Sequence, residues 1–424
     1  MQNSAARSYW PVVILLMLVV GLGHFNRVGM SVAGTERIIP EYKIAPDQMG
    51  LVYSAFLLFY TLAMLPGGWF IDRFGARAAL AAYGFASAAF VALTGCVGLL
   101  WDDARGVWLG LIAVRSLMGV VNAPLHPASA RMVYGHVPAG AKSLANGLVT
   151  FAACVGIAGT FYILGPLIDR WDWPRAFLIT SVFTAAVACV WLVGTRYATA
   201  APAGGGKLEM AAPRLSELWP LLGRRSVICI TLSYAAMGFF QYLFFYWIEY
   251  YFETVQKQGV DVARQYSALT TLAMGAGMVC GGWLADKVPA AFGPRIRRRL
   301  VPMLGMIASG VVFELGLLSP DIRVTLAAFA LAAALLGATE GAFWTTVVEL
   351  GGRFGGTAAG LMNTGGNAGG TLSPYVTPLL STYFAAQFGE ELGWRLGLSV
   401  AGAVSILGAL LWCGVDPGRD AAEA

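Results

Sequence analysis

Long apolar segments alternate with short polar breaks along almost the whole chain. Twelve such segments can be read, at residues 9–33, 48–70, 78–100, 106–130, 143–168 and 175–196, and then at 226–251, 266–286, 299–319, 323–349, 357–382 and 393–414. Each has roughly the 20 residues that an α-helix needs to cross a hydrocarbon layer of about 30 Å. The pattern predicts an all-α membrane protein with twelve transmembrane helices.

The composition agrees with lipid as the solvent for most of the chain. Of the 424 residues, 58% are hydrophobic and 12% are charged, whereas a soluble domain has about 25% charged residues. The first apolar segment is longer than the apolar core of a cleaved signal peptide, about 7–15 residues, so we expect it to remain as helix 1. The six cysteines lie within or beside the apolar segments without paired spacing, so no disulfide or metal site is expected.

One polar segment divides the series in the middle. Residues 197–225 read ATAAPAGGG and later PRLSELWPLLGRR, which predicts a flexible linker followed by a short amphipathic interfacial segment. We therefore expect an N-terminal half at residues 1–196, a cytoplasmic linker at 197–225 and a C-terminal half at 226–424.

A short repeat relates the two halves. Gly67-Gly68-Trp69-Phe70-Ile71-Asp72-Arg73 follows the second predicted helix, and Gly281-Gly282-Trp283-Leu284-Ala285-Asp286-Lys287 follows the eighth. Each copy follows the same helix of its half, on the same side of the membrane. The repeat predicts two pseudo-symmetric bundles of six helices each.

The basic residues indicate the orientation. Most of the 28 Lys and Arg residues flank the membrane on the side of the N-terminus. The positive-inside rule then places both termini in the cytoplasm, with the protein in the cell inner membrane. Because the net charge of +5 comes from these membrane-flanking loops, nucleic-acid binding is not expected.

The segment from Gly68 to Arg77, GWFIDRFGAR, resembles the loop signature between helices 2 and 3 of the major facilitator superfamily. Phe25-Asn26-Arg27, the run from Arg115 to Pro127 and the run from Gly360 to Pro374 are similar to the anion:cation symporter branch, with its hexuronate, galactonate and vesicular organic-anion carriers. The resemblance implies a secondary transporter, expected to be a monomer, that moves a sugar acid or another carboxylate by alternating access, with proton symport.

The loop signature places charges at helix ends. Asp72, Arg73 and Arg77, with Asp286 in the repeat, can pair between helices and across the halves. We expect them to control the conformation without contacting the substrate. The alternative is a basic loop with a solvated aspartate.

Two arginines fall inside predicted helices. A charge in hydrocarbon costs about 2.5–3.5 kcal/mol on insertion scales, so Arg27 and Arg115 are candidate functional residues. A guanidinium suits a carboxylate, and the resemblance associates both positions with substrate binding or coupling. The alternative is a structural arginine that donates to backbone carbonyls.

The chain also departs from the family pattern. The resemblance implies acids where Asn26 and Asn122 stand. An amide can bind a hydroxyl group of a sugar acid but cannot carry a proton. An uncoupled facilitator or an anion exchanger is therefore the alternative to proton symport.

Other polar groups in the predicted helices complete the candidate site. The candidates for proton coupling are His24, Glu340 and Glu249. The candidates for substrate contact, besides the arginines and Asn26 and Asn122, are Tyr60, which matches a cavity-facing position of the family, Trp344, Asn363 and Asn367.

The sequence contains no nucleophile triad and no metal-ligand cluster. Its glycine runs lie inside apolar segments, so they are not phosphate-binding loops. We therefore expect neither an enzyme nor a cofactor. A transport-deficient sensor would usually carry a long appended domain, which the chain lacks.

Overall fold

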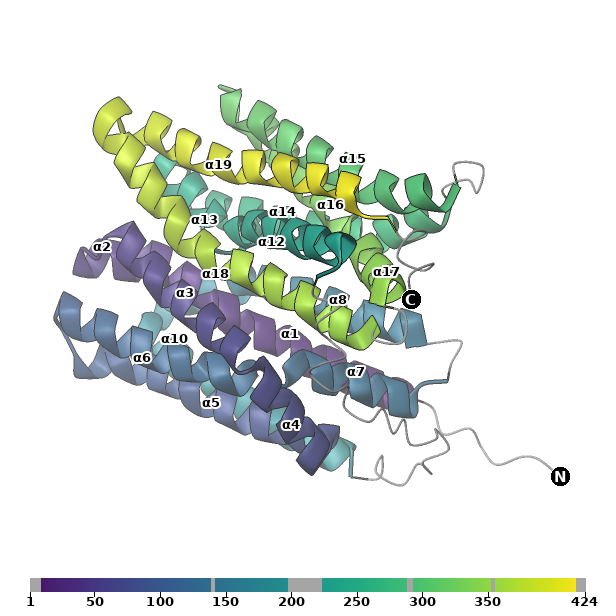
Figure 1. The fold of residues 1–424 in the computed structure, drawn as a ribbon. Coiled ribbons are helices and arrows are strands. Elements are labelled where there is room, and N and C mark those ends of the chain that lie inside the picture. The colour runs from purple at the N-terminus through teal and green to yellow at the C-terminus, as the bar shows by residue number, and fades with distance from the viewer. Residues whose placement is uncertain (1–8, 139–141, 197–222, 288–292, 352–354, 417–424) are drawn as a thin grey trace.

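The computed structural model describes residues 9–138, 142–196, 223–287, 293–351 and 355–416 (Figure 1). These residues form helices joined by short connections, and no strand is present among them. Nine of the described helices are long and apolar enough to cross a membrane. The prediction of an all-α membrane protein is confirmed, and each of the twelve predicted segments is helical.

The N-terminal half begins with one long helical segment that changes its winding. In order, its elements are α1 (Trp10–Ala33), η1 (Gly34–Ile38), α2 (Ile39–Tyr42), α3 (Pro46–Leu62), α4 (Met64–Phe74), α5 (Ala76–Leu100), α6 (Ala104–Asn122), α7 (Leu125–His136), α8 (Lys142–Gly159), η3 (Thr160–Leu164), α9 (Gly165–Trp171) and α10 (Trp173–Gly194). Most of the predicted linker lies outside the described residues.

The C-terminal half follows the same plan. Its elements are α12 (Arg225–Tyr246), α13 (Ile248–Tyr250), η5 (Tyr251–Val255), α14 (Val260–Lys287), α15 (Gly293–Leu318), α16 (Ile322–Gly337), α17 (Glu340–Gly351), α18 (Gly355–Phe388), α19 (Glu390–Leu410) and η8 (Leu411–Gly414). We call the end of the molecule that holds residues 194 and 225 the linker side. The opposite end, which holds α2, is the far side (Figure 1).

Several helical segments are longer than their apolar patterns predict, and two of the extensions contact each other. The first continues beyond residue 33 through a π-helical turn to Tyr42, and the eighth begins at Val260 instead of residue 266. Both additions contain charged residues, Glu36 and Arg264, which pair with each other. A hydropathy pattern ends a helix at such residues because it takes no account of a partner from another part of the chain.

The halves meet along two pairs of helices. α3 of the N-terminal half packs against α18, and α8 packs against α14 (Figure 1). Within the N-terminal half, α8 also packs against α1 at a very short distance. A Cβ atom added to Gly156 would lie 1.9 Å from the carbonyl oxygen of Gly21. Glycine is therefore required at this crossing.

The helix crossing gives a test of the fold. Gly156→Ala gains helix propensity, yet we expect it to lower the melting temperature of the detergent-solubilised protein by several degrees, because two backbones must move apart. Gly147→Ala is the control in the same helix, since no atom lies within 4 Å of its added Cβ, and it should be neutral or stabilising. Equal melting temperatures for the two variants would contradict the close crossing.

Candidate functional site

A cavity of about 260 Å³ lies between the two halves, near the middle of the helices. α1, α3, α7 and α8 line it from one half, and α12, α14, α17 and α18 line it from the other. Its polar lining residues are His24, Arg27, Tyr60, His126, Thr150, Tyr234, Gln241, Tyr242, Glu340, Trp344, Asn363 and Asn367. The predicted substrate contacts Arg27, Tyr60, Trp344, Asn363 and Asn367 thus surround one space, as do the coupling candidates His24 and Glu340.

Arg27 supplies the positive charge of this cavity. Its side chain is only 7% exposed, and its guanidinium donates to the hydroxyl of Tyr242. The guanidinium carbon lies 5.2, 5.4 and 5.0 Å from the ring centroids of Phe56, Tyr60 and Tyr242. Among the described residues, no carboxylate lies within ion-pair distance of it. Aromatic faces compensate a buried cation only in part, so the site favours a bound anion.

Arg115 lies behind this surface and does not line the cavity. Its guanidinium donates to the carbonyls of Asn26 and Arg27, at 3.2 and 2.6 Å, and lies 4.9 Å from the ring centroid of Phe56. The side chain is 1% exposed. In this conformation the two guanidinium groups do not converge on one space, and Arg115 has the backbone-bonded arrangement that was the structural alternative.

The two asparagines that replace the acids of the family pattern are also outside the cavity. Asn26 donates to the hydroxyl of Thr184 at 2.9 Å. Asn122 donates to Ser87 Oγ at 3.3 Å and to the carbonyl of Met118 at 2.8 Å. Both amides therefore join helices within the N-terminal half.

The C-terminal half contributes a carboxylate to the cavity. Tyr234 Oη and Trp344 Nε1 each donate to Glu340 Oε1 at 2.7 Å. Glu340 Oε2 is buried and has no hydrogen-bond partner among the described residues. Oε2 therefore remains as an acceptor for a ligand.

Asn363 and Asn367 lie on the adjoining wall. Their amide nitrogens are 3.8 and 3.3 Å from the sulfur of Met64 in α4. A thioether is a weak acceptor, so both amides remain available to a polar ligand.

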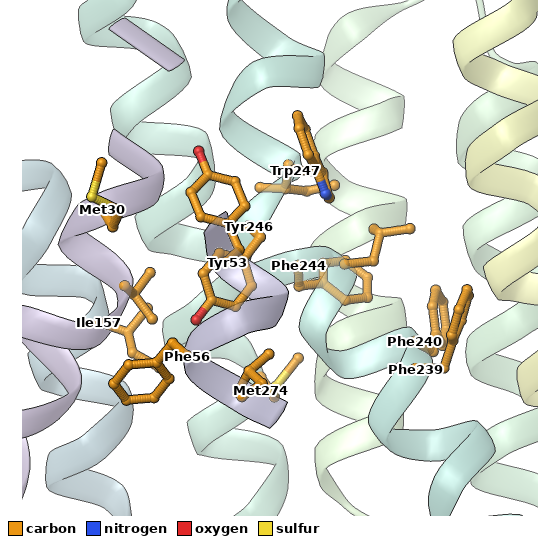
Figure 2. Packing of buried hydrophobic residues seen from close by; sticks show 14 of the residues in the cluster. Met30, Tyr53, Phe56, Ile157, Phe239, Phe240, Phe244, Tyr246, Trp247 and Met274 are labelled. Carbon is orange, nitrogen blue, oxygen red and sulfur yellow. The ribbon is translucent and has the colours of Figure 1, made fainter. Parts of the chain in front are cut away.

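Buried aromatic rings close the cavity towards the far side. Tyr53 of α3 stacks on Tyr246 of α12, with ring centroids 4.9 Å apart, and Trp247 lies 5.7 Å from Tyr53 (Figure 2). Trp247 Nε1 donates to the carbonyl of Pro374 in α18 at 2.9 Å. The aromatic residues at the end of the seventh predicted helix thus contact the other half.

An ion cluster crosses between the halves beyond these rings. Arg264 of α14 binds Glu36 through two hydrogen bonds, of 2.6 and 2.8 Å, and binds Asp169 of α9 at 2.6 Å. The side chains of Arg264 and Glu36 are 4% and 3% exposed. Such a bidentate, buried pair joins the halves firmly. The sequence analysis missed it because it placed Arg264 in a loop.

Glu253 and Glu249 also lie beside this cluster, as does Asp261, whose Oδ1 is 3.5 Å from Arg264. Burial, and then the negative charge of Glu36, raise the pKa of Glu253 from 4.5 to about 7, while Arg264 opposes the shift. The arrangement in which the two halves meet on the far side is therefore favoured at acidic pH. It loses that advantage as the pH rises from 4.5 through about 7. The coupling candidate Glu249 lies here and not at the cavity; it has no ion pair among the described residues, and Arg264 pairs with Glu36 instead.

The predicted gating residues lie on the linker side. Arg77 donates to Thr195 Oγ1 at 3.0 Å and to the carbonyl of Leu192 at 2.8 Å, which joins α5 to the end of α10. Arg73 is exposed. The side chains of Asp72 and Asp286 lie outside the described part of the structure, so their gating role stays a prediction.

The sequence analysis also missed cavity residues that stand beside the motifs it used. His126 lies in the run from Arg115 to Pro127, where the break at Pro124 starts α7. Its Nε2 is 3.4 Å from His24 Nε2. Gln241 and Tyr242 lie in the seventh predicted helix, at residues 226–251. The motifs indicated the correct helices, but not which faces meet.

Comparisons with known proteins agree with this architecture. The sequence model of the Major Facilitator Superfamily matches residues 13–374. The probable galactarate/D-glucarate transporter GudP of Escherichia coli strain K12 is 24% identical, over 96% of this chain and 93% of the relative. The D-galactonate transporter of Escherichia coli O6:H1 is 26% identical, over 95% and 94%.

A solved structure shares the fold. It is a bacterial homologue of the human lysosomal transporter Spinster, in an inward-facing and unoccupied conformation. It is 18% identical, with a TM-score of 0.77 over 99% of both chains. The similarity confirms the predicted arrangement of twelve helices in two pseudo-symmetric bundles.

The ion cluster gives a test of how the far side is held closed. In Arg264→Gln we expect the fraction of molecules with separated halves on this side to rise at least about tenfold, because breaking a buried ion pair costs about 3–5 kcal/mol. The measurement is the distance distribution between spin labels at the exposed positions Asp102 and Gln387. Arg395→Gln, which removes a partly exposed ion pair within α19, is the control. An unchanged distribution in Arg264→Gln would contradict the role of the cluster.

Proposed function

Because the chain belongs to the major facilitator superfamily, we propose that it carries a small organic anion across the inner membrane by alternating access, with the anion's carboxylate bound at Arg27. The observation that carries this proposal is the guanidinium of Arg27 at the cavity surface, with aromatic rings around it and no carboxylate of the described residues within ion-pair distance. A planar guanidinium can bind a carboxylate through two parallel hydrogen bonds. The bound anion neutralises a charge that the protein itself leaves unpaired.

The surrounding groups support a sugar acid as the substrate. The relatives named above are transporters of galactarate, D-glucarate and D-galactonate. In this chain, Asn363, Asn367, Gln241 and Tyr60 offer donors and acceptors for hydroxyl groups. The free oxygen of Glu340 accepts hydroxyl hydrogens but repels a second carboxylate. We therefore expect a polyhydroxy monocarboxylate to be preferred over a dicarboxylate.

The closed far side defines the conformational state. Under the positive-inside rule, the linker side with both termini is cytoplasmic and the far side is periplasmic. The aromatic rings and the Arg264 cluster then separate the cavity from the periplasm. Opening to the periplasm requires that Arg264 leave Glu36 and Asp169. The protein acts as a monomer, since one chain contains the whole cavity.

Two modes of transport are compatible with this site. Proton symport is the first, with the proton and the anion moving inward together. The second is uncoupled diffusion or anion exchange, and it is favoured by the hydrogen bonds that keep Asn26 and Asn122 inside the N-terminal half. Neither amide can carry a proton.

The test of the proposal is uptake of a radiolabelled panel of aldonates, aldarates and simple dicarboxylates into proteoliposomes. Saturable uptake of at least one sugar acid, absent from protein-free liposomes, is the expected result. Failure of every carboxylate in the panel, together with uptake of a neutral sugar, would contradict it.

Replacing the arginine tests the carboxylate site. Arg27→Gln should lower the efficiency of uptake by at least about thirtyfold, because removing one partner of a buried charge pair costs about 2–5 kcal/mol. Arg27→Lys should recover only part of this loss, since an ammonium lacks the planar fork. Arg105→Lys, at an exposed position on the far side, is the control. Wild-type uptake by Arg27→Gln would contradict the assignment.

Replacing the glutamate tests the substrate preference. Glu340→Gln keeps the size of the side chain and removes its charge, so uptake of an aldarate relative to an aldonate should rise about tenfold or more. The control is Glu314→Gln, whose carboxylate accepts from Ser399 in the C-terminal half, away from the cavity. A ratio that does not change in Glu340→Gln would show that this carboxylate does not face the second end of the substrate.

A further inference from the structure

Two of the three histidines of the chain face each other at the cavity. His24 comes from α1 and His126 from the first turn of α7. Their Nε2 atoms are 3.4 Å apart, and their ring planes are inclined at 69° with centroids 5.1 Å apart. Both rings line the cavity that holds Arg27. None of the contacts assigned to the substrate above uses this pair.

The hydrogen bonds of the pair determine where protons reside. His24 Nδ1 lies 3.0 Å from the carbonyl oxygen of Val20. A carbonyl only accepts, so Nδ1 carries a hydrogen, and Nε2 of the neutral ring is an acceptor. His126 Nε2 then donates a hydrogen bond to His24 Nε2. The lone pair of His126 Nδ1 is therefore free to accept a proton. One added proton at this atom gives an imidazolium that shares its charge with His24 through the Nε2 contact.

The charges around the pair make this proton depend on the anion. The titratable and charged groups near it are Arg27 on α1, Tyr60 on α3, Tyr83 on α5, Cys154 on α8, Tyr242 on α12 and Glu340 on α17. Arg27, one helical turn from His24, opposes a second positive charge in the empty cavity. A carboxylate bound to Arg27 removes this opposition. Each ligand then increases the affinity for the other by the same factor.

The other candidates for a proton fit less well. Asn26 and Asn122 cannot carry one. Glu340 already accepts from Tyr234 and Trp344 through Oε1, and the proposed function uses its Oε2 for the hydroxyl groups of the substrate. Glu249 lies beyond the aromatic rings, on the far side. Among the described candidates, the histidine pair lies at the cavity, and its member His24 is one helical turn from Arg27.

We propose that His24 and His126 form the proton-binding site of this carrier, which takes up one proton together with the anion at Arg27 and releases both on the cytoplasmic side. The inference rests on the proposed function, which supplies the anion. It requires no oxidant, reductant or other reactant, since a proton only joins and leaves an imidazole nitrogen. Symport is thereby retained although both family acids are asparagines.

The experiment compares two modes of transport of radiolabelled D-galactonate in proteoliposomes. Counterflow, the exchange of labelled for unlabelled anion, needs the anion site but no net proton movement. Accumulation driven by an inward proton gradient needs both. His24→Gln and His126→Gln should keep counterflow within about twofold of the wild type and lose gradient-driven accumulation. His136→Gln, the third histidine, on the same helix as His126 but away from the cavity, should behave as the wild type.

A pH profile gives a second measurement. The apparent affinity of the wild type for D-galactonate should fall about tenfold between pH 6 and pH 8, and the two cavity variants should show a flat profile. If His24→Gln fails to fold, His126→Asn tests the pair from the other helix. Gradient-driven accumulation by both cavity variants at the wild-type level would overturn the inference. So would a loss of this accumulation in Glu340→Gln but in neither histidine variant. Absence of counterflow in the wild type would overturn the proposed function, and with it the inference.

Discussion

The buried guanidinium of Arg115 determines how the N-terminal half presents its charge. Hydrocarbon offers no partner for a cation, so its hydrogens must be accepted by the protein. The carbonyls of Asn26 and Arg27 accept them, at 3.2 and 2.6 Å, which joins α6 to the middle of α1. Because Arg115 donates to backbone carbonyls within this half, the neighbouring side chain of Arg27, and not that of Arg115, lines the cavity. The proposed anion site thus depends on the hydrogen bonds of a second arginine, Arg115.

A third buried arginine, Arg264, has acidic partners instead. This difference distinguishes a gating arginine from a ligand-binding one. Arg264 is paired with two acids of the other half, so its charge holds the halves together on the far side. Arg27 has aromatic rings and the hydroxyl of Tyr242, so its charge remains available to a ligand. A carrier needs both arrangements, because a site whose charge was already paired inside the protein would have little affinity for an anion.

The apolar pattern predicted the helices well, and charges inside them identified much of the cavity. Arg27, Glu340 and Asn367 were found because a polar group in hydrocarbon needs a reason to be there. The pattern failed where partners distant in sequence decide the outcome. It ended the first helix before Glu36, and it left open whether Arg115 binds the ligand or donates to the backbone. It also passed over His126, because its closeness to His24 depends on how α7 packs against α1 after the break at Pro124.

The central claim is that one guanidinium, that of Arg27, holds the carboxylate of the transported anion. A cryo-electron microscopy structure of the protein with bound D-galactonate tests it most directly. The account predicts a carboxylate within hydrogen-bond distance of Arg27, with the hydroxyl end of the ligand towards Glu340. A carboxylate bound elsewhere, such as at Arg115, with Arg27 still donating only to Tyr242, would contradict it.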